Sequence, residues 1–340
     1  MKSANVLLLM VISMLLASCA VTSDSSMPMQ TASTRPEASE STAMVMDAPP
    51  GPDLCTTRDC LMSLVDDYLA ALVAGEPGSL PFADDAIFVE NVMRKAIGEG
   101  LWQSATGLPG EFRIYVPDPV SKQAGFMGLM EVNGEPALLA LRLQVEGDGI
   151  NAAEHIVVPV TSDRALGKLI RPRPGFHMEI DEDERLSRRE LLSIGYSYYP
   201  ALDDNDGTLA PFADDCLRIE NGMQTSTNPN AATVFGKMNC GPQISTNYFQ
   251  YIDSIDNRRV NVADPVTGLV MGLSHFRHGF EQKETPIVGV EGITTRDVSM
   301  FDPFDMPAMH IFKVGPEGQI HEIEAVGLLA PYMSPTGWGF

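Results

Sequence analysis

The sequence predicts an α+β protein that contains two copies of one domain in tandem. A stretch that begins Pro-Phe-Ala-Asp-Asp at Pro81 ends at Asn91, and its second copy runs from Pro211 to Asn221. A helical pattern precedes each copy, and runs typical of antiparallel strands follow each one. A long internal repeat of this kind has to be recognised before any chemistry is assigned, because it sets the number of domains.

The N-terminus predicts export. Lys2 precedes an apolar run, residues 6–16, that is shorter than a membrane span requires. The sequence Leu-Ala-Ser-Cys, which ends at Cys19, resembles the bacterial lipobox. That resemblance implies removal of residues 1–18, diacylation of the Cys19 thiol and acylation of the new N-terminus, with palmitate as an acyl chain. With Ala20 next, it also implies sorting to the outer membrane of a Gram-negative bacterium. The alternative is an ordinary signal peptide in which Cys19 carries no lipid.

Composition narrows the classes of partner. The apolar content of 44% over 340 residues is enough for two buried cores. The formal charge of -22 disfavours binding to a phosphate backbone, so we expect no nucleic acid. Residues 19–55 are rich in Ser, Thr, Pro and Met without periodicity, which is typical of a disordered tether.

The remaining four cysteines favour disulfides. An exported protein meets an oxidising compartment, and the number of cysteines besides Cys19 is even. We expect Cys55–Cys60, which are close in sequence, and Cys216–Cys240, which close a loop inside the second copy. Zinc is the competing interpretation, but no CxxC spacing recurs, so no metal is expected.

The first domain is predicted over residues 56–160. The pattern Thr-x-x-Asp at Thr56 is typical of a capping box, apolar residues from Leu61 to Leu72 recur at helical spacing, and Gly75 is a suitable stop. Alternating or apolar runs predict the strands 87–89, 111–116, 125–132, 137–145 and 152–158.

Residues 161–186 are predicted to be a linker, because they contain an Arg-Pro-Arg-Pro-Gly stretch and four consecutive acidic residues. The acidic run favours a solvated segment over a calcium loop, which needs spaced oxygens. The second domain, 187–332, begins with a full capping box at Ser187 and Glu190, and residues 333–340 form a tail. Its predicted strands are 248–253, 269–280, 309–314 and 320–328.

A helix followed by Phe-Ala-Asp-Asp-x-hydrophobic-x-hydrophobic-Glu resembles the SnoaL-like branch of the nuclear transport factor 2-like superfamily, in both copies. The resemblance implies two cone-shaped domains, each a curved antiparallel sheet wrapped around N-terminal helices, with an apolar pocket. It also implies that the two halves pack together as a pseudo-dimer. Members include both enzymes and proteins that only bind, so the fold does not choose a function.

Function is expected where the copies differ. Alignment through Met127-Gly128 and Met271-Gly272 places Glu131 opposite His275. Alignment through Ile150 and Ile320 places Ala140 opposite His310 and Asn151 opposite His321. Because the imidazoles occur only in the second copy, the second domain is predicted to hold the pocket.

The candidate catalytic residues are His310 and His275 as acid or base, with Tyr251 or Glu220 orienting or polarising the substrate. A buried imidazole beside apolar residues is expected to titrate near neutrality. Strand alternation keeps His275 and His278 out of one pocket. The competing interpretation makes His275 and His310 ordinary core residues.

No nucleophile elbow, zinc-protease, Walker or dinucleotide motif is present, so no cofactor is expected. The leading hypothesis is a lipoprotein whose second domain binds a hydrophobic small molecule and catalyses cofactor-free isomerisation, dehydration or hydrolysis. The alternative is a non-catalytic binding or assembly module at the cell envelope.

Overall fold

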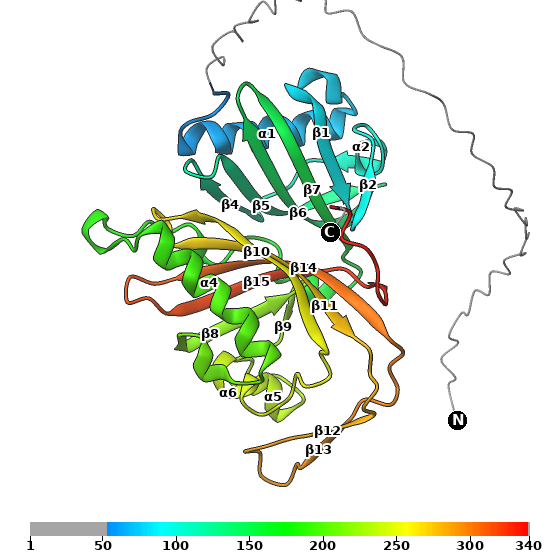
Figure 1. Ribbon diagram of the computed structural model, residues 1–340, viewed down its shortest axis with the longest axis vertical. Helices are drawn as coiled ribbons and strands as arrows, with labels where there is room; N and C mark the ends of the chain where they lie inside the picture. Colours follow the sequence, from blue (N-terminus) through cyan, green and yellow to red (C-terminus); the bar gives the residue numbers. More distant parts are fainter. Residues whose placement is uncertain (1–52, 339–340) are drawn as a thin grey trace, which may run out of the picture. The chain divides into compact units, whose positions relative to one another are not determined.

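The computed structural model describes residues 53–338, which form two halves of mixed α+β structure (Figure 1). The predicted signal peptide, Cys19 and the tether up to residue 52 lie outside the described residues. Among the helices of the described part, none has both the length and the apolar character that a membrane span requires.

The N-terminal half begins with helix α1 (Arg58–Ala74). Its N-cap is Thr57, one residue later than predicted, whose side chain accepts a hydrogen bond from the backbone N–H of Cys60. Gly75 ends the helix with a φ of 67°, a left-handed conformation that glycine adopts without strain. The other elements of this half are η1 (Pro77–Ser79), β1 (Phe82–Glu90), β2 (Met93–Lys95), α2 (Leu101–Ser104), β3 (Ala105–Gly107), β4 (Arg113–Asp118), β5 (Gln123–Val132), β6 (Glu135–Glu146) and β7 (Gly149–Pro159).

The C-terminal half begins with α4 (Arg188–Asp203), and the predicted capping box of Ser187 and Glu190 is confirmed. The elements that follow are η4 (Gly207–Leu209), β8 (Phe212–Glu220), β9 (Met223–Gln224), α5 (Val234–Lys237), α6 (Cys240–Ile244), β10 (Ser254–Asp264), β11 (Leu269–His278), β12 (Glu284–Pro286), β13 (Thr295–Asp297), β14 (Phe304–Val314), β15 (Ile320–Gly327) and β16 (Ala330–Pro331).

One strand prediction in this half is wrong. Residues 248–253 form a turn, and the strand is β10, which follows them. The run Asp256-Asn257-Arg258-Arg259 shows no apolar alternation, and β10 pairs with β11 through two register shifts. At a register shift the side chains no longer alternate strictly between the two faces of the sheet. The sequence therefore lacks the alternation of apolar and polar residues that predicts a strand.

Both halves have the same strand order. The first sheet runs β2-β1-β7-β6-β5, with β3 and β4 both paired to β5, and the second runs β9-β8-β15-β14-β11-β10, with β16 paired to β14. All pairs are antiparallel except β1–β7 and β8–β15, which are parallel. The expectation of wholly antiparallel sheets is therefore wrong at one pair in each half, because the motif strand lies beside the last long strand of its own half.

Strand pairing also gives the structural correspondence between the halves. Ile150 corresponds to Ile320, as predicted, because each pairs with the Phe that follows Pro in its own motif copy. His310 corresponds to Leu141, since His310 pairs with Ala325 and Leu141 pairs with the equivalent residue of β7. The predicted counterpart of His310 was the preceding residue, Ala140.

The alignment through Met127-Gly128 and Met271-Gly272 is wrong by two residues. Strands β5 and β11 each begin beside the last residue of the preceding strand, which is an Asp in both halves, Asp118 and Asp264. Counting from these pairs makes Gly125 the counterpart of Met271. His275 then corresponds to Leu129, whereas Glu131 corresponds to Arg277. A repeated dipeptide in apolar strands is a weak register marker, because several shifts preserve the apolar pattern.

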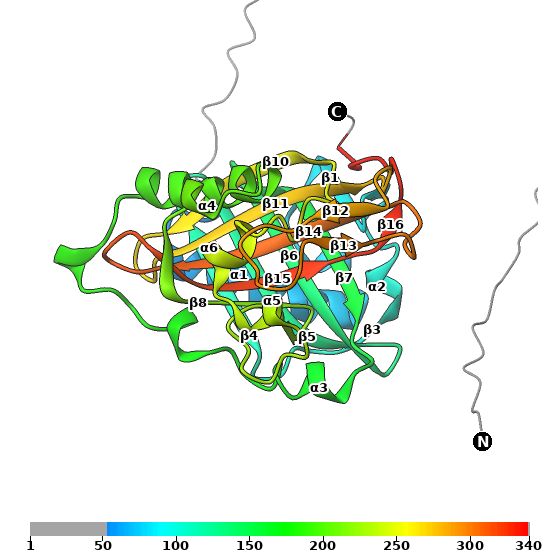
Figure 2. The same cartoon turned by 90° about the horizontal axis from the view of Figure 1, so that it is seen from below.

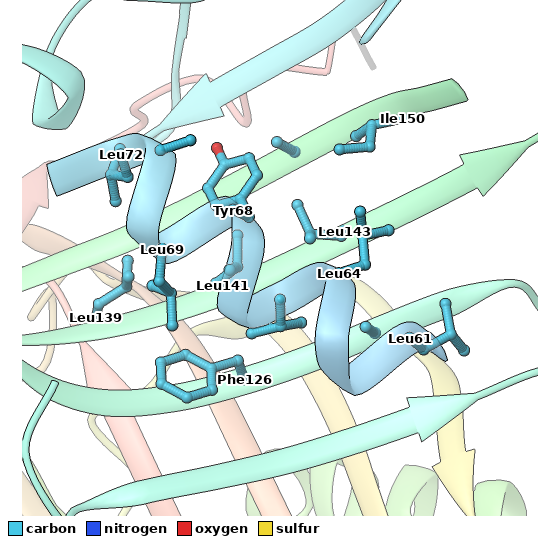
Figure 3. Close-up of a cluster of buried hydrophobic side chains, with 14 of the residues drawn as sticks. Leu61, Leu64, Tyr68, Leu69, Leu72, Phe126, Leu139, Leu141, Leu143 and Ile150 are labelled. Carbon is cyan, nitrogen blue, oxygen red and sulfur yellow. The ribbon is translucent and has the colours of Figure 1, made fainter. Parts of the chain in front are cut away.

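In the N-terminal half, α1 packs on one face of its sheet (Figure 3). The helix contributes apolar side chains at helical spacing, and the strands supply the opposing layer. The helix residues are Leu61, Leu64, Tyr68, Leu69 and Leu72, and the strand residues are Phe126, Leu139, Leu141, Leu143 and Ile150. Helix α4 lies along β10 and β11 of the second sheet in the same way (Figure 2).

The opposite faces of the two sheets share a second apolar cluster. It combines buried residues of both halves: Ile114, Val116, Met127 and Ile156 from the first, and Val262, Met271, Met309 and Ile311 from the second. A Cβ added to Gly125 would lie 2.1 Å from Cε of Met271, so only glycine lets the two sheets approach this closely here.

The segment between the halves is folded onto them. It contains α3 (Asp163–Leu166), η2 (Pro174–Phe176) and η3 (Glu182–Glu184), and it buries Leu169 and Phe176 in the shared cluster. The predicted linker is therefore part of the core and not an open connection.

Trp338, near the other end of the described chain, places its ring over two arginines. Arg142 lies 5.0 Å and Arg259 5.4 Å from the ring centroid, and these arginines come from β6 and β10 of different halves. Both arginines also contact the buried Glu154.

The two expected disulfides are present, Cys55–Cys60 at the start of α1 and Cys216–Cys240 between β8 and α6.

A candidate ligand pocket in the C-terminal half

A cavity of about 340 Å³ lies inside the C-terminal half. This volume is at the lower end of ordinary small-molecule sites, about 300–1,000 Å³. The helix α4, the curved strands β8, β11 and β14, and the turn before β10 contribute side chains to its wall. The aromatic and aliphatic part of that wall is made of Leu202, Phe249, Tyr251, Ile252, Phe276, Phe304 and Met306.

The polar part of the wall is centred on Arg218, which β8 places in the interior at 1% exposure. Its Nε donates to Oγ1 of Thr225 at 3.0 Å and lies 3.0 Å from Oε1 of Glu220. Its Nη2 donates to Oε1 of Gln243. The guanidinium also lies 4.9 Å from the ring centroid of Phe249, a cation–π distance.

His310 lies on the same wall, fully buried among aromatic rings. Its Nδ1 is 3.5 Å from the hydroxyl of Tyr199, and its ring is 5.2 Å from that of Tyr198. Burial and the positive charge of Arg218 lower the pKa of His310 to about 3. The imidazole is therefore neutral at physiological pH, and the expectation that it titrates near neutrality is wrong, because no carboxylate stands beside it to hold the proton.

A stack of flat rings forms another side of the cavity. Tyr251 lies 5.7 Å from His278 with nearly parallel planes, and His278 lies 4.4 Å from Phe304. Burial lowers the pKa of His278 to about 4, so this ring is also neutral. The guanidinium of Arg296 also lies over the ring of Tyr251, at 4.6 Å from the ring centroid.

Three of the four predicted site residues meet in this cavity: His310, Tyr251 and Glu220. His275 does not, because it lies on the other face of β11. There its Nε2 is 3.1 Å from Oγ of Ser334 and 3.3 Å from the carboxylate of Asp305. His275 is thus a satisfied core residue, and strand alternation correctly separated it from His278.

Two lining residues, Arg218 and His278, were absent from the prediction. The signal for Arg218 lies in the repeat, since the motif has Phe88 at the corresponding position and a charged residue replaces it only in the second copy. His278 was noticed as a strand residue, but nothing in the sequence indicated which face of that strand would line a cavity.

In the N-terminal half, aromatic side chains occupy the corresponding interior. Tyr68 and Trp102 are buried with ring centroids 5.2 Å apart, and Phe88 takes the place of Arg218. The hydroxyl of Tyr68 is 2.9 Å from Nε2 of His155, a buried histidine that the sequence comparison overlooked. Nδ1 of His155 lies 3.5 Å from Glu90, the counterpart of Glu220.

No group of three or more potential metal ligands occurs within residues 53–338. The polar groups that line the cavity are instead the guanidinium of Arg218, several hydroxyls and two neutral imidazoles. Glu220 is the single carboxylate among them. Such a set can hold an uncharged or weakly polar molecule by apolar contact and a few hydrogen bonds.

The fold and the cavity define an α+β protein with two similar halves, one of which encloses a cavity lined mainly by apolar side chains. Residues 184–327, which cover most of the C-terminal half, match a family described as "Domain of unknown function (DUF8021)". No curated protein matches the chain.

Among solved structures, similarity is found to a chain from "Intriguing role of epoxide hydrolase/cyclase-like enzyme SalBIII in pyran ring formation in polyether salinomycin". The match covers 43% of this chain and 98% of that chain, at 11% identity and a TM-score of 0.27. These values are too low to transfer a function. The SnoaL-like assignment stays a prediction, while the coarser expectation of a mixed α+β fold agrees with the structure.

Proposed function

We propose that the C-terminal half binds a small, mainly apolar molecule in the cavity between α4 and its sheet. The observation that carries the proposal is the cavity itself, about 340 Å³ lined by aromatic and aliphatic side chains. An apolar molecule that enters the cavity would remove the apolar surface of these side chains from water, which is favourable. The N-terminal half differs in this respect, because its own aromatic side chains, Tyr68, Phe88 and Trp102, occupy the corresponding space.

Equilibrium dialysis with 2-ethylnaphthalene tests this proposal. Ala308 lines the cavity and is 3% exposed, so Ala308→Phe places a ring in the space and is expected to abolish binding. Val288 is 46% exposed and lies outside the cavity, so Val288→Phe is the matched control and keeps wild-type affinity. Wild-type protein that binds neither this probe nor an analogue of similar size with a polar substituent, or binding that survives in Ala308→Phe, would contradict the proposal.

Cofactor-free proton transfer is the second candidate, favoured by the single carboxylate at the cavity. Glu220 is 39% exposed at its side chain and is held by Arg218, so it is the group best placed to take a proton from a bound molecule. His310 is a weak base there, because its pKa is about 3. If the protein is an enzyme, Glu220→Gln is expected to abolish turnover while leaving ligand affinity within a few fold.

The sequence further supports lipid attachment at Cys19 and a place at the cell envelope, in line with the two disulfides. Expression of the full chain with labelled palmitate tests this. Label and membrane association are expected in wild type and lost in Cys19→Ser. A Cys19→Ser protein that stays with the membrane fraction would exclude the lipid as its anchor.

A further inference from the structure

The guanidinium of Arg218 has one nitrogen without a partner. Its Nε and Nη2 are bonded, as described above, but Nη1 is buried and has no hydrogen-bond partner among the described residues. A buried N–H group that lacks an acceptor is rare in native structures and destabilising, more so when it is charged. Arg218 lines the cavity beside Tyr198, and Nη1 has almost no accessible surface of its own, so an acceptor on a bound molecule would satisfy this nitrogen once the two side chains shift apart slightly.

The charges around Arg218 decide what kind of acceptor fits. Glu220 already balances the guanidinium at 3.0 Å. The histidines of the wall, His310 and His278, are neutral because burial lowers the pKa of each. Burial raises the pKa of Tyr198 to about 12, so its phenol is also uncharged. The cavity therefore has no positive charge left for an anion, and a second buried carboxylate would stand uncompensated.

We infer, on the basis of the proposed function, that the molecule bound here is uncharged and carries a carbonyl oxygen that accepts a hydrogen bond from Nη1 of Arg218. A carbonyl is a strong acceptor that adds no charge, and a charge-assisted hydrogen bond to it is stronger than one between neutral groups. The apolar remainder of the molecule lies against the ring wall of Tyr251, Phe276 and Phe304. The ligand class is thus an apolar ketone, ester or lactone.

Three naphthalenes of similar size separate this inference from the proposed function in wild-type protein. They are 2-ethylnaphthalene, which has no acceptor, 2-acetylnaphthalene, which has a ketone, and 2-naphthoate, which has an anionic carboxylate. The ketone is expected to bind about tenfold more tightly than the hydrocarbon, and the carboxylate more weakly than the ketone. Equal affinity for hydrocarbon and ketone, or tightest binding of the carboxylate, would overturn the inference and leave the proposed function standing. Failure of all three to bind would overturn both.

Substitution of Arg218 locates the effect. Arg218→Met is expected to bring the ketone affinity down to that of the hydrocarbon, whereas Arg258→Met, whose guanidinium pairs with Asp203 away from the cavity, keeps the wild-type ratio. If Arg218→Met does not fold, the infrared carbonyl band of 2-acetylnaphthalene bound to wild-type protein decides. A shift to lower wavenumber than in alkane solvent supports the hydrogen bond, and an unshifted band excludes it.

Discussion

Two nitrogens of the Arg58 guanidinium donate hydrogen bonds to the carboxylate of Asp264, at 2.9 to 3.1 Å, although the two residues belong to different halves. The reverse contact joins Arg188 to Asp118, at 2.7 and 3.0 Å. Each arginine follows the N-cap of its helix, and each aspartate ends the corresponding strand. Reciprocal contacts of this kind are the mark of a two-fold interface. We propose that the halves are related as the subunits of a two-fold dimer are.

Replacing either aspartate is expected to cost similar stability. Asp264→Asn and Asp118→Asn each keep the oxygen that caps the following turn but lose the charge that faces the arginine. Because both carboxylates are almost fully buried, we expect the free energy of unfolding to fall by about 2 kcal/mol in each variant, measured with urea. Asp66→Asn is the control, since its pair with Arg113 is exposed and worth about 0.5 kcal/mol. Losses no larger than in this control would argue against the interface.

His310 predicts an acid-sensitive stability. Its pKa is about 3 in the folded protein and about 6.5 in an unfolded chain, so the folded state binds fewer protons between these values. The stability that depends on neutral His310 is present above pH 6.5 and is lost as the pH falls toward 3. His310→Leu, which copies Leu141 of the other half, is expected to flatten the urea-unfolding profile over pH 4 to 6.5. Some dependence of stability on pH remains in the variant, because the pKa of His278 is also lowered, to about 4. A pH dependence as steep as that of the wild-type protein would contradict the prediction.

The lowered pKa of Glu90 predicts that the protein loses further stability at lower pH. Burial raises the pKa of Glu90, but the nearby His155 and hydrogen bonds from Lys95 and the backbone N–H of Leu101 outweigh it and bring the pKa to about 2. Its contribution is present above about pH 4.3 and is lost as the pH falls toward 2. We expect Glu90→Gln to lower the free energy of unfolding by about 2 kcal/mol at pH 7. Below about pH 4.3 the variant should lose less of its remaining stability than the wild-type protein does.

Glu99→Gln is the control for Glu90→Gln, because Glu99 is an exposed glutamate that accepts one backbone hydrogen bond, from the N–H of Ala96. The side chain of Glu90 is only 8% exposed. The loss of unfolding free energy at pH 7 should therefore be clearly smaller for Glu99→Gln. Equal losses would mean that the buried hydrogen bonds of Glu90 contribute little.

The two disulfides are expected to differ in weight. Cys216 and Cys240 are separated by 24 residues and Cys55 and Cys60 by 5, and a longer closed loop restricts the unfolded chain more. Replacing Cys216 and Cys240 with serine should lower the free energy of unfolding by about 3 kcal/mol. Replacing Cys55 and Cys60 should lower it by about 1 kcal/mol less. Denaturation of the two double variants without reductant measures this, and the opposite ranking would contradict the loop argument.

The sequence predicted most of the fold because its signals there are local. The capping box at Ser187 marked a helix, and the repeated motif marked two strands in equivalent places. The misses occurred where local signals conflict with tertiary structure. The strand β10 carries polar residues through two register shifts, and the parallel pairs of β1 and β8 depend on contacts between distant parts of the chain.

The lining of the cavity was predicted in part for the same reason. His310 was found because it lies in an apolar alternation, and His275 was chosen by an alignment that was two residues out of register. Arg218 was missed because a charged residue in a short strand suggests exposure, whereas the structure buries it beside Glu220 and Gln243. A comparison of the motif copies at Phe88 and Arg218 would have exposed this difference.

The placement of the two tryptophans makes the chain its own optical reporter. Trp102 lies in the ring cluster of the N-terminal half, and Trp338 lies on arginines from both halves. Since these are the only tryptophans in the sequence, tryptophan emission excited without tyrosine carries no signal from the wall of the cavity. Separation of the halves would expose Trp338 to water and redden its emission while Trp102 stays unchanged, so the spectrum distinguishes opening of the junction from unfolding of the N-terminal core.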